Sequence, residues 1–282
     1  MFDTVTVVGV GLIGGSFGLV LKERKLAKKV IGISRSKESI EAALRLGLID
    51  ETLELSQAVA KSDLIYVAIP VDATVTVVGE IMDMISGNQI VADAGSTKYA
   101  LCNSINGHPM RRRFVATHPM WGTEFSGPEA ATRDSFAGRS CVICEREQCE
   151  EDALLTIEEI YKTLGMHLVY MDAASHDMHA AYVSHIAHIT SFALANTVLE
   201  KEKEEDAIFE LAGGGFESTV RLAKSSPAMW APVFMQNREN VLDVLNEHIS
   251  QLKKFKSCLE KENNDYLWEL MVNANKIKRI IK

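Results

Sequence analysis

Short β-branched, apolar runs alternate with amphipathic stretches over the first 170 residues of the chain. The runs predict strands, and the stretches whose apolar positions follow a helical repeat predict helices. This alternation is typical of a parallel sheet that helices cover on both faces. The predicted strands are residues 4–8, 30–34, 64–69, 89–92, 114–117, 139–144 and 167–170. The predicted helices are residues 14–22, 37–46, 55–61, 74–84 and 149–163.

The strand pattern stops after residue 171, and only helical patterns follow it. They cover residues 173–199, 207–224, 231–258 and 260–281. We therefore expect an α/β domain at residues 1–171 and an all-α domain at residues 172–282. We expect the helical domain to contribute to substrate binding. Because long, apolar-rich helices must be buried somewhere, we also expect it to join two copies of the chain in a homodimer.

A glycine-rich turn lies between the first predicted strand and the first predicted helix. Residues 9–14 read Gly-Val-Gly-Leu-Ile-Gly, in the context that a dinucleotide-binding motif requires. Gly9 would allow the tight turn, Gly11 would let the backbone approach a pyrophosphate, and Gly14 would permit close helix packing. We therefore expect a Rossmann-type domain that binds phosphates at a helix N-terminus. The expected cofactor contacts, including the end of a later strand, are Gly9, Gly11, Leu12, Ile13, Gly14, Ile69 and Pro70.

The end of the second predicted strand bears on the choice of cofactor. An NAD site usually has an acidic residue here, which bonds the ribose hydroxyls. This chain has Ser34, Arg35 and Ser36 instead. A carboxylate would repel a 2′-phosphate, whereas two hydroxyls and a guanidinium would bind one. These three residues favour NADP over NAD, although NAD stays open because some NAD enzymes also lack the acid.

Polar sequences follow three of the predicted strands, at the edge where a doubly wound sheet binds its ligands. Oxidation of an alcohol by hydride transfer needs a base that takes the hydroxyl proton. His118 lies in such a loop, and an ordinary histidine pKa is close to working pH. Ser96 would hydrogen-bond the same hydroxyl or orient the imidazole. The alternative for His118 is a loop histidine that caps a turn.

The start of the helical domain is rich in histidine. Four of the eight histidines in the chain are His176, His179, His185 and His188. His185 and His188 are three residues apart and share a helix face, so we expect a pair that faces substrate. No matching acidic or cysteine ligand accompanies them, so we expect no metal. Arg221 would clamp a carboxylate with two parallel hydrogen bonds, although alone it would equally suit a helix surface.

Composition and charge narrow the class of protein. The net charge of −8 argues against a nucleic-acid partner, and residues 111–113, three arginines, are the one candidate basic patch. Residues 4–21 are uncharged, but their five glycines favour a strand, turn and helix over a membrane span. The first residues lack the cationic region of a secretory signal. We therefore expect a cytoplasmic protein with a small-molecule substrate and no membrane or nucleic-acid partner.

The five cysteines are scattered along the chain. Cys141 and Cys144 have the spacing of half a zinc site or of a redox pair. No second such pair follows, and the surrounding segment has the pattern of a strand, which points alternate side chains apart. Reduced thiols of a cytosolic protein are the better interpretation.

Five of these segments together resemble the prephenate/arogenate dehydrogenase family of tyrosine biosynthesis. They follow the family order and cover most of the chain. The matching segments are residues 9–16 (GVGLIGGS), 93–98 (DAGSTK), 118–124 (HPMWGTE) with 126–127, 184–188 (SHIAH) and 213–230 (GGGFESTVRLAKSSPAMW).

The resemblance implies oxidative decarboxylation of prephenate to 4-hydroxyphenylpyruvate with NAD or NADP, or of arogenate to tyrosine. It implies that His118 deprotonates the ring hydroxyl, with Ser96 beside it. Arg221 and His188 would hold the acid and side-chain groups of the substrate. The pocket positions that the resemblance adds are Glu124 and Trp230.

Two other functions fit parts of the sequence. A β-hydroxyacid-type dehydrogenase shares the two-domain plan but usually relies on a lysine on the first long helix after the nucleotide domain, where this chain has histidines. A nucleotide-sensing binding protein would need neither a base nor an anion clamp. The histidines argue against the dehydrogenase, and the combination of Ser96, His118, His188 and Arg221 argues against the binding protein.

Overall fold

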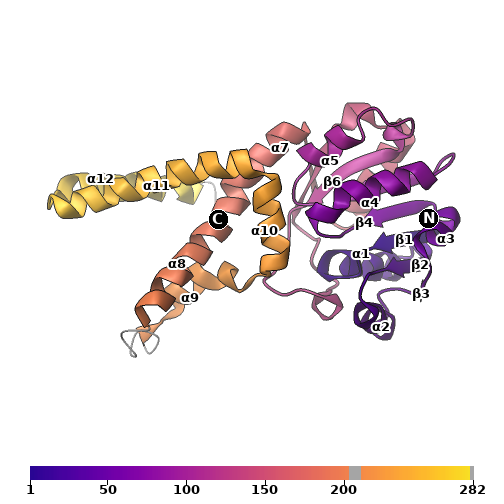
Figure 1. Cartoon of the computed structure of the whole chain (residues 1–282), viewed down its shortest axis with the longest axis horizontal. Coiled ribbons are helices and arrows are strands. Elements are labelled where there is room, and N and C mark those ends of the chain that lie inside the picture. The colour runs from indigo at the N-terminus through magenta and orange to yellow at the C-terminus, as the bar shows by residue number, and fades with distance from the viewer. Residues whose placement is uncertain (203–210, 280–282) are drawn as a thin grey trace. The chain divides into compact units, whose positions relative to one another are not determined.

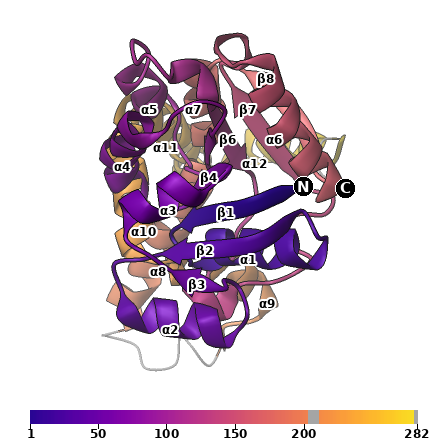
Figure 2. The same cartoon turned by 90° about the vertical axis from the view of Figure 1, so that its right-hand side faces the viewer.

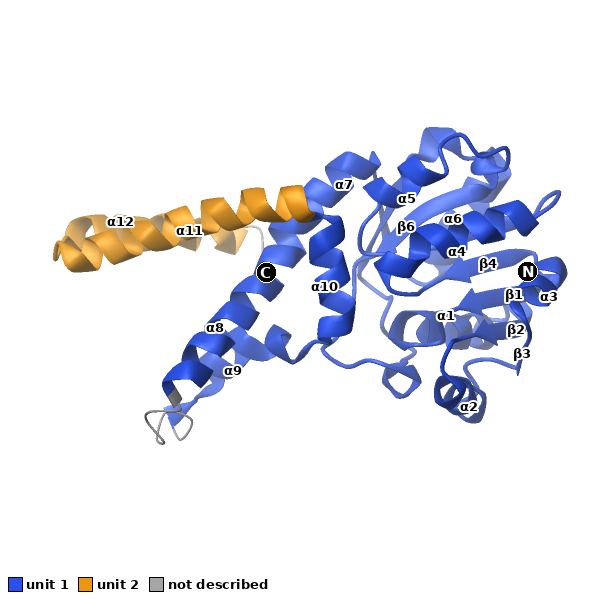
Figure 3. Ribbon diagram, viewed as in Figure 1, with its two compact units in different colours: residues 1–237 blue, residues 238–282 orange. Residues whose placement is uncertain are grey.

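The computed structural model describes residues 1–202 and 211–279, and its contacts divide the chain into two compact units. Residues 1–237 form the first unit and residues 238–282 the second (Figure 3). The sheet ends at Met171, next to the boundary that we expect between an α/β and a helical domain. The first helices after the sheet nevertheless belong to the same compact unit as the sheet.

One sheet forms the centre of the first unit (Figures 1 and 2). Its strand order is β3-β2-β1-β4-β5-β6-β7-β8. Strands β2 and β3 follow β1 on one side and β4 lies on its other side, so the strand order switches direction between β1 and β4, as in a Rossmann-type fold. The strands are β1 (Phe2–Val8), β2 (Ala27–Ile33), β3 (Glu51–Thr52), β4 (Leu64–Val67), β5 (Ile90–Asp93), β6 (Phe114–Pro119), β7 (Ser140–Cys144) and β8 (His167–Met171).

The sheet is parallel as predicted from β3 through to β6, but β7 runs antiparallel to β6. The reason lies in the connection, because a parallel pair requires a crossover and residues 120–139 contain only a single 3₁₀ turn, Pro128–Ala130. β8 then pairs parallel to β7 after a helical crossover.

Helices cover both faces of the sheet. Alternate residues of β4 show this arrangement: Leu64 and Tyr66 belong to one apolar cluster, and Ile65 and Val67 belong to the other. The first cluster includes residues of α1 (Leu12–Glu23), α2 (Lys37–Arg45) and α6 (Glu151–Thr163). The second includes residues of α3 (Leu55–Lys61), α4 (Val71–Met84) and α5 (Tyr99–Ser104).

Among the described residues, the first unit continues with the helices α7 (Ala173–Ala180), α8 (Ile186–Glu202), α9 (Gly214–Val220) and α10 (Pro227–Gln236). A π-helical turn, Ala181–His185, joins α7 to α8, so the helix predicted at residues 173–199 contains a local expansion. The helix predicted at residues 207–224 begins outside the described residues. Its described part is α9 with a following 3₁₀ turn, Arg221–Lys224.

The second unit is a pair of helices, α11 (Arg238–Glu260) and α12 (Asn264–Ala274), with a 3₁₀ turn, Asn275–Arg279, after them. The side chain of Asn263 accepts a hydrogen bond from the backbone N–H of Tyr266 at 3.1 Å and so caps α12. Residues 280–281 of the last predicted helix lie outside the described residues. Among the helices that the structure describes, none is both long and apolar enough to span a bilayer.

Candidate active site

A cavity of about 1090 Å³ lies in the first unit where the parallel strands end. The loops after β1, β4 and β5 line it, together with the end of β6 and segments of the later helices. Eleven of the residues predicted to form the site therefore surround one space. They are Gly11, Leu12, Ile13, Ile69, Pro70, Ser96, His118, Glu124, His188, Arg221 and Trp230.

The glycine turn shapes the cofactor end of the cavity. Gly9 has φ +97°, and a Cβ on it would lie 2.3 Å from the carbonyl oxygen of Ala68. A Cβ on Gly14 would lie 1.9 Å from the carbonyl oxygen of Gly9. Both positions therefore require glycine, for the turn and for helix packing as predicted, and neither lines the cavity.

Gly11 differs from these two glycines, because a Cβ on it would meet no atom within 4 Å. Gly11 is also the N-cap of α1, and no side chain caps that helix end. The first N–H groups of α1, at Leu12 and Ile13, therefore remain available to an anion beside an open space. This arrangement fits the pyrophosphate of a dinucleotide.

The end of β2 lies beside the glycine turn, since the N–H of Gly9 donates to the carbonyl of Ile33 at 2.8 Å. Arg35 is exposed, and Ser34, Arg35 and Ser36 lie outside the cavity lining. The Ser36 hydroxyl caps α2 and donates to Glu38 at 2.7 Å. That hydrogen bond lowers the pKa of Glu38, so a negative charge lies two residues beyond Ser36. This carboxylate lies outside the dinucleotide motif, so the motif alone does not indicate it.

His118 and Ser96 lie on neighbouring strand ends and both line the cavity. The His118 side chain is buried at the end of β6, and Ser96 follows β5. Burial, together with the nearby His176 and Lys98, lowers the pKa of His118 well below the ordinary histidine value of 6.5. The imidazole is therefore neutral at physiological pH, which is the form that accepts a proton.

A buried chain of hydrogen bonds continues behind His118. Its Nδ1 lies 2.8 Å from Nε2 of His176, and Nδ1 of His176 lies 2.7 Å from Oδ1 of Asp177. The Asp177 carboxylate also accepts the backbone N–H groups of Lys98, at 2.7 Å, and Tyr99, at 3.0 Å. The ring nitrogen of His118 that this chain leaves for a substrate is Nε2.

Below the cavity, a buried ion pair joins the ends of β5 and β6. The Lys98 ammonium pairs with the Asp93 carboxylate and donates to the carbonyl of Thr117 at 2.8 Å. The hydroxyl of Thr117 lies 2.7 Å from that of Tyr161, which lies 3.1 Å from that of Tyr66. These contacts link the residues on both sides of Ser96, Asp93 and Lys98, to Thr117, the residue before His118.

The opposite wall carries the predicted substrate contacts. Nη1 of Arg221 lies 2.9 Å from Oε2 of Glu124, and Arg221 is 49% exposed. The hydrogen bond of Glu124 to its own backbone N–H and the contact with Arg221 lower the pKa of that carboxyl. Because Glu124 contacts only Nη1, the guanidinium keeps further N–H groups for a ligand carboxylate.

Trp230 and His188 form a stacked pair, with ring centroids 3.5 Å apart. Nδ1 of His188 donates to the carbonyl of Ser184 at 3.0 Å, which leaves Nε2 for a ligand, and burial lowers the pKa of this ring. His185 instead lies behind the wall: it is 1% exposed, and its ring centroid is 5.9 Å from that of Trp230. Any influence of His185 on a substrate would pass through Trp230.

The amino-acid sequence matches two domains of one family over almost the whole chain. The prephenate dehydrogenase nucleotide-binding domain matches residues 17–170, and the prephenate dehydrogenase dimerization domain matches residues 172–273. The chain belongs to the prephenate dehydrogenase family.

Individual relatives agree with this assignment. The prephenate dehydrogenase of Bacillus subtilis is 31% identical over 97% of this chain and 75% of its own length. The cyclohexadienyl dehydrogenase of Zymomonas mobilis is 26% identical over 100% of this chain and 97% of its own length. The crystal structure of prephenate dehydrogenase from A. aeolicus with hydroxyphenyl propionate and NAD⁺ has a TM-score of 0.88, with 30% identity over 99% of this chain and 98% of that one.

The arginine run of this prephenate dehydrogenase family member is part of the fold. Arg111 and Arg113 are each only 4% exposed. Nη1 of Arg113 contacts Glu150 at 2.9 Å and Asp152 at 2.8 Å, near the start of α6. Two of the three arginines are therefore buried, and the exposed Arg112 lies 3.9 Å from the Glu150 carboxylate.

The cysteines of this family member all carry free, buried thiols. Cys141 and Cys144 belong to the apolar clusters on opposite faces of the sheet, which rules out a shared site for these two side chains. Among the residues that the structure describes, no group of three or more His, Cys, Asp or Glu side chains is arranged around a metal position.

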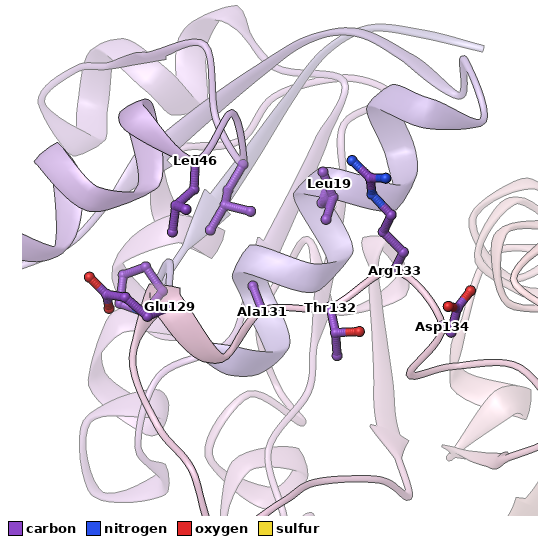
Figure 4. A pocket seen from close by; sticks show the side chains of 9 residues that line it. Leu19, Leu46, Glu129, Ala131, Thr132, Arg133 and Asp134 are labelled. Carbon is purple, nitrogen blue, oxygen red and sulfur yellow. The ribbon is translucent and has the colours of Figure 1, made fainter.

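A second hollow of about 350 Å³ lies beside α1 (Figure 4). Two of its charged residues have ion-pair partners: Nε of Arg133 lies 2.6 Å from Glu23, and Glu129 lies 3.5 Å from Arg45. No described histidine lines it, whereas eleven of the residues predicted to form the site of this prephenate dehydrogenase family member line the larger cavity.

Proposed function

We propose that this chain catalyses the oxidative decarboxylation of prephenate to 4-hydroxyphenylpyruvate, with a nicotinamide dinucleotide as hydride acceptor. One observation carries the proposal: the neutral base His118, the uncapped start of α1 and the cationic Arg221 line the same cavity. Membership of the prephenate dehydrogenase family and the similarity to the A. aeolicus complex support it.

In the proposed reaction, Nε2 of His118 takes the proton of the ring hydroxyl while Ser96 hydrogen-bonds the same oxygen. The bound dinucleotide supplies the hydride acceptor for the carbon that carries this hydroxyl. The bond to the ring carboxylate then breaks, CO₂ leaves, and its electron pair completes an aromatic ring. Aromatisation and the loss of CO₂ make the reaction essentially irreversible.

The remaining residues would bind and orient the substrate. Arg221 would pair with a substrate carboxylate through the N–H groups that Glu124 does not use. His188 would present Nε2 to the substrate side chain, and Trp230, stacked on it, would fix the ring plane. His185 would support Trp230 from behind.

Arogenate is the second candidate substrate, because a relative over the whole chain is named a cyclohexadienyl dehydrogenase. Arogenate carries an amino group in place of the keto group of prephenate. Glu124, whose pKa is lowered, supplies a negative charge on the cavity wall that would pair with this ammonium. We place prephenate first and arogenate second.

For the cofactor, we propose that Arg35 gives NADP the advantage over NAD. The exposed guanidinium at the end of β2 would pair with a 2′-phosphate, whereas the Glu38 carboxylate next to Ser36 would oppose it. The A. aeolicus complex contains NAD⁺, so NAD is expected to work as well. Replacing Arg35 with Ala should lower the NADP-to-NAD ratio of kcat/KM, and replacing Glu38 with Gln should raise it.

We also propose that the chain forms a homodimer through its helical part. We propose that this homodimer carries out its reaction in the cytoplasm. The matching family domain at residues 172–273 is described as a dimerization domain. Five free, buried thiols suit a reducing compartment.

Formation of reduced cofactor in a two-by-two grid, prephenate or arogenate with NAD or NADP, tests the proposed function. We expect activity with prephenate in at least one cofactor, with the strongest rate for NADP. Silence in all four combinations, with a dinucleotide still bound, would remove the proposal.

A further inference from the structure

His176 and Asp177 occupy consecutive positions in α7, outside every role assigned so far. We propose that they form a positioning pair that holds His118 in the tautomer with an unprotonated Nε2, and that Asp177 also fixes the loop that carries Ser96. This inference rests on the proposed function for its kinetic consequences. Its structural part concerns the protonation of one ring and stands without a substrate.

The direction of the hydrogen bonds follows from the groups at Asp177. Backbone N–H groups can only donate, so the carboxylate accepts from Lys98 and Tyr99, and it accepts from Nδ1 of His176 as well. A neutral imidazole that donates from Nδ1 has a lone pair on Nε2. In the proposed pair His176 is such a neutral ring, so its Nε2 accepts and its partner at 2.8 Å, Nδ1 of His118, donates. The proton of His118 is thus on Nδ1, and its Nε2 is free to act as the base.

Burial stabilises this direction of the hydrogen bonds. His176 is 2% exposed and Asp177 is 3% exposed, so water does not compete for these hydrogen bonds. The other ionisable groups that face the pair are already engaged. The Lys98 ammonium binds Asp93 and the carbonyl of Thr117. Nδ1 of His185 accepts from the amide of Asn237 at 3.2 Å.

The same carboxylate connects the base to the Ser96 loop. Lys98 is the N-cap of α5, and no side-chain hydrogen bond of its own caps that helix. Asp177 binds the first two backbone N–H groups there, two and three residues after Ser96. One side chain of α7 therefore positions both groups that we assign to the substrate hydroxyl.

The pair also lowers the cost of proton uptake. When the O–H bond of the substrate breaks, a new N–H bond forms at Nε2 of His118, and the ring becomes an imidazolium. Its Nδ1–H still donates to His176, and the Asp177 carboxylate beyond it supplies a compensating negative charge. A positive ring at a buried position is otherwise strongly unfavourable.

The first experiment observes the tautomer directly. In the ¹⁵N spectrum of histidine-labelled chain with dinucleotide absent, we expect His118 as the Nδ1–H form, assigned by loss of its signal in His118→Asn. The Asp177→Asn variant should change this to a mixture with the Nε2–H form. An Nε2–H ring in the unaltered chain would overturn the proposal, whether or not the chain acts on prephenate.

The second experiment measures kinetics with a matched control. We expect His176→Phe to lower kcat about tenfold or more, within the range that general-base catalysis supplies, while KM for prephenate changes little. His176→Gln keeps an amide near the Nε2 position and should recover part of the rate. His179, exposed on the same helix, provides the control His179→Gln, which should behave as the unaltered chain.

A His176→Phe variant that folds and keeps the kcat and pH profile of the unaltered chain would contradict the positioning role. Equal losses for Phe and Gln, with a lowered melting temperature in both, would assign His176 to the fold alone. An inactive unaltered chain with an Nδ1–H His118 would contradict the proposed function and leave the tautomer assignment in place.

Discussion

His118 combines a buried ring, a place in the cavity lining and a hydrogen-bond partner at Nδ1. Replacing it with Asn keeps a polar side chain of similar size but removes the base. We expect kcat to fall by about 10²–10⁴, the usual contribution of a general base, while dinucleotide affinity stays nearly unchanged. Steady-state kinetics and a titration of the cofactor measure the two quantities. A variant that keeps most of its turnover would show that another group takes the proton.

The pH profile follows from the lowered pKa of His118. The base works in its neutral form, and a lowered pKa keeps it neutral further into acid. We therefore expect kcat/KM to hold as pH falls through 6.5 and to decline only when pH passes the lowered His118 value. An acid limb centred at 6.5 or above would contradict the burial argument.

Arg221 tests the substrate side of the cavity. Arg221→Ala removes the guanidinium that would bind a carboxylate, so KM for prephenate should rise about tenfold or more, as for the loss of a charge-assisted pair, with a smaller effect on kcat. Arg221→Lys keeps the charge but loses the planar pair of donors and should give an intermediate KM. An unchanged KM in the Ala variant would remove Arg221 from the site.

At the level of elements, the glycine turn contains one position that we expect to affect folding, Gly14, and one that we expect to affect cofactor binding, Gly11. In Gly14→Ala, the new Cβ would clash with the backbone of Gly9, so we expect a lower melting temperature. In Gly11→Ala, the new Cβ has free space, so the fold should persist, whereas the methyl group would occupy the place of the pyrophosphate. Thermal melting and dinucleotide titration distinguish the two variants. Tight dinucleotide binding by Gly11→Ala would place the cofactor elsewhere.

The sequence predicts elements whose apolar pattern is long enough to repeat. The seven predicted strands all occur, whereas β3, with two residues, and α5, with six, are too short to show a period. The reversal of β7 also escapes prediction, because a strand has the same pattern in either direction. Only the absence of a helix between residues 114–117 and 139–144 indicates it.

The sequence also predicts only those site residues that belong to a local pattern. Residues in motifs, such as Gly11 and His118, are found because chemistry and local spacing coincide. The contact of His118 with His176 spans 58 positions and belongs to no motif, so only the fold brings the two rings together. The consecutive pair of His176 and Asp177 in a histidine-rich segment was the one available signal.

At the scale of the whole molecule, the second unit leaves large apolar side chains exposed, among them Leu252 at 55% and Trp268 at 62%. Such side chains are typical of an interface between copies. We expect Leu252→Glu with Trp268→Glu to convert a dimer into monomers in sedimentation velocity. The control Lys253→Glu, an exposed neighbour, should leave the dimer intact. A monomeric unaltered chain would contradict the proposed assembly.

We propose that one cavity couples oxidation of a ring alcohol to loss of a carboxylate. Simultaneous measurement of reduced cofactor and released CO₂, with purified chain and prephenate, tests it most directly. We expect the two products in equal amounts from the first turnover, and both formed more slowly by the same factor of about 10²–10⁴ in His118→Asn. Reduction of the cofactor without release of CO₂ would contradict this proposal. Formation of both products by His118→Asn at the rate of the unaltered chain would contradict it as well.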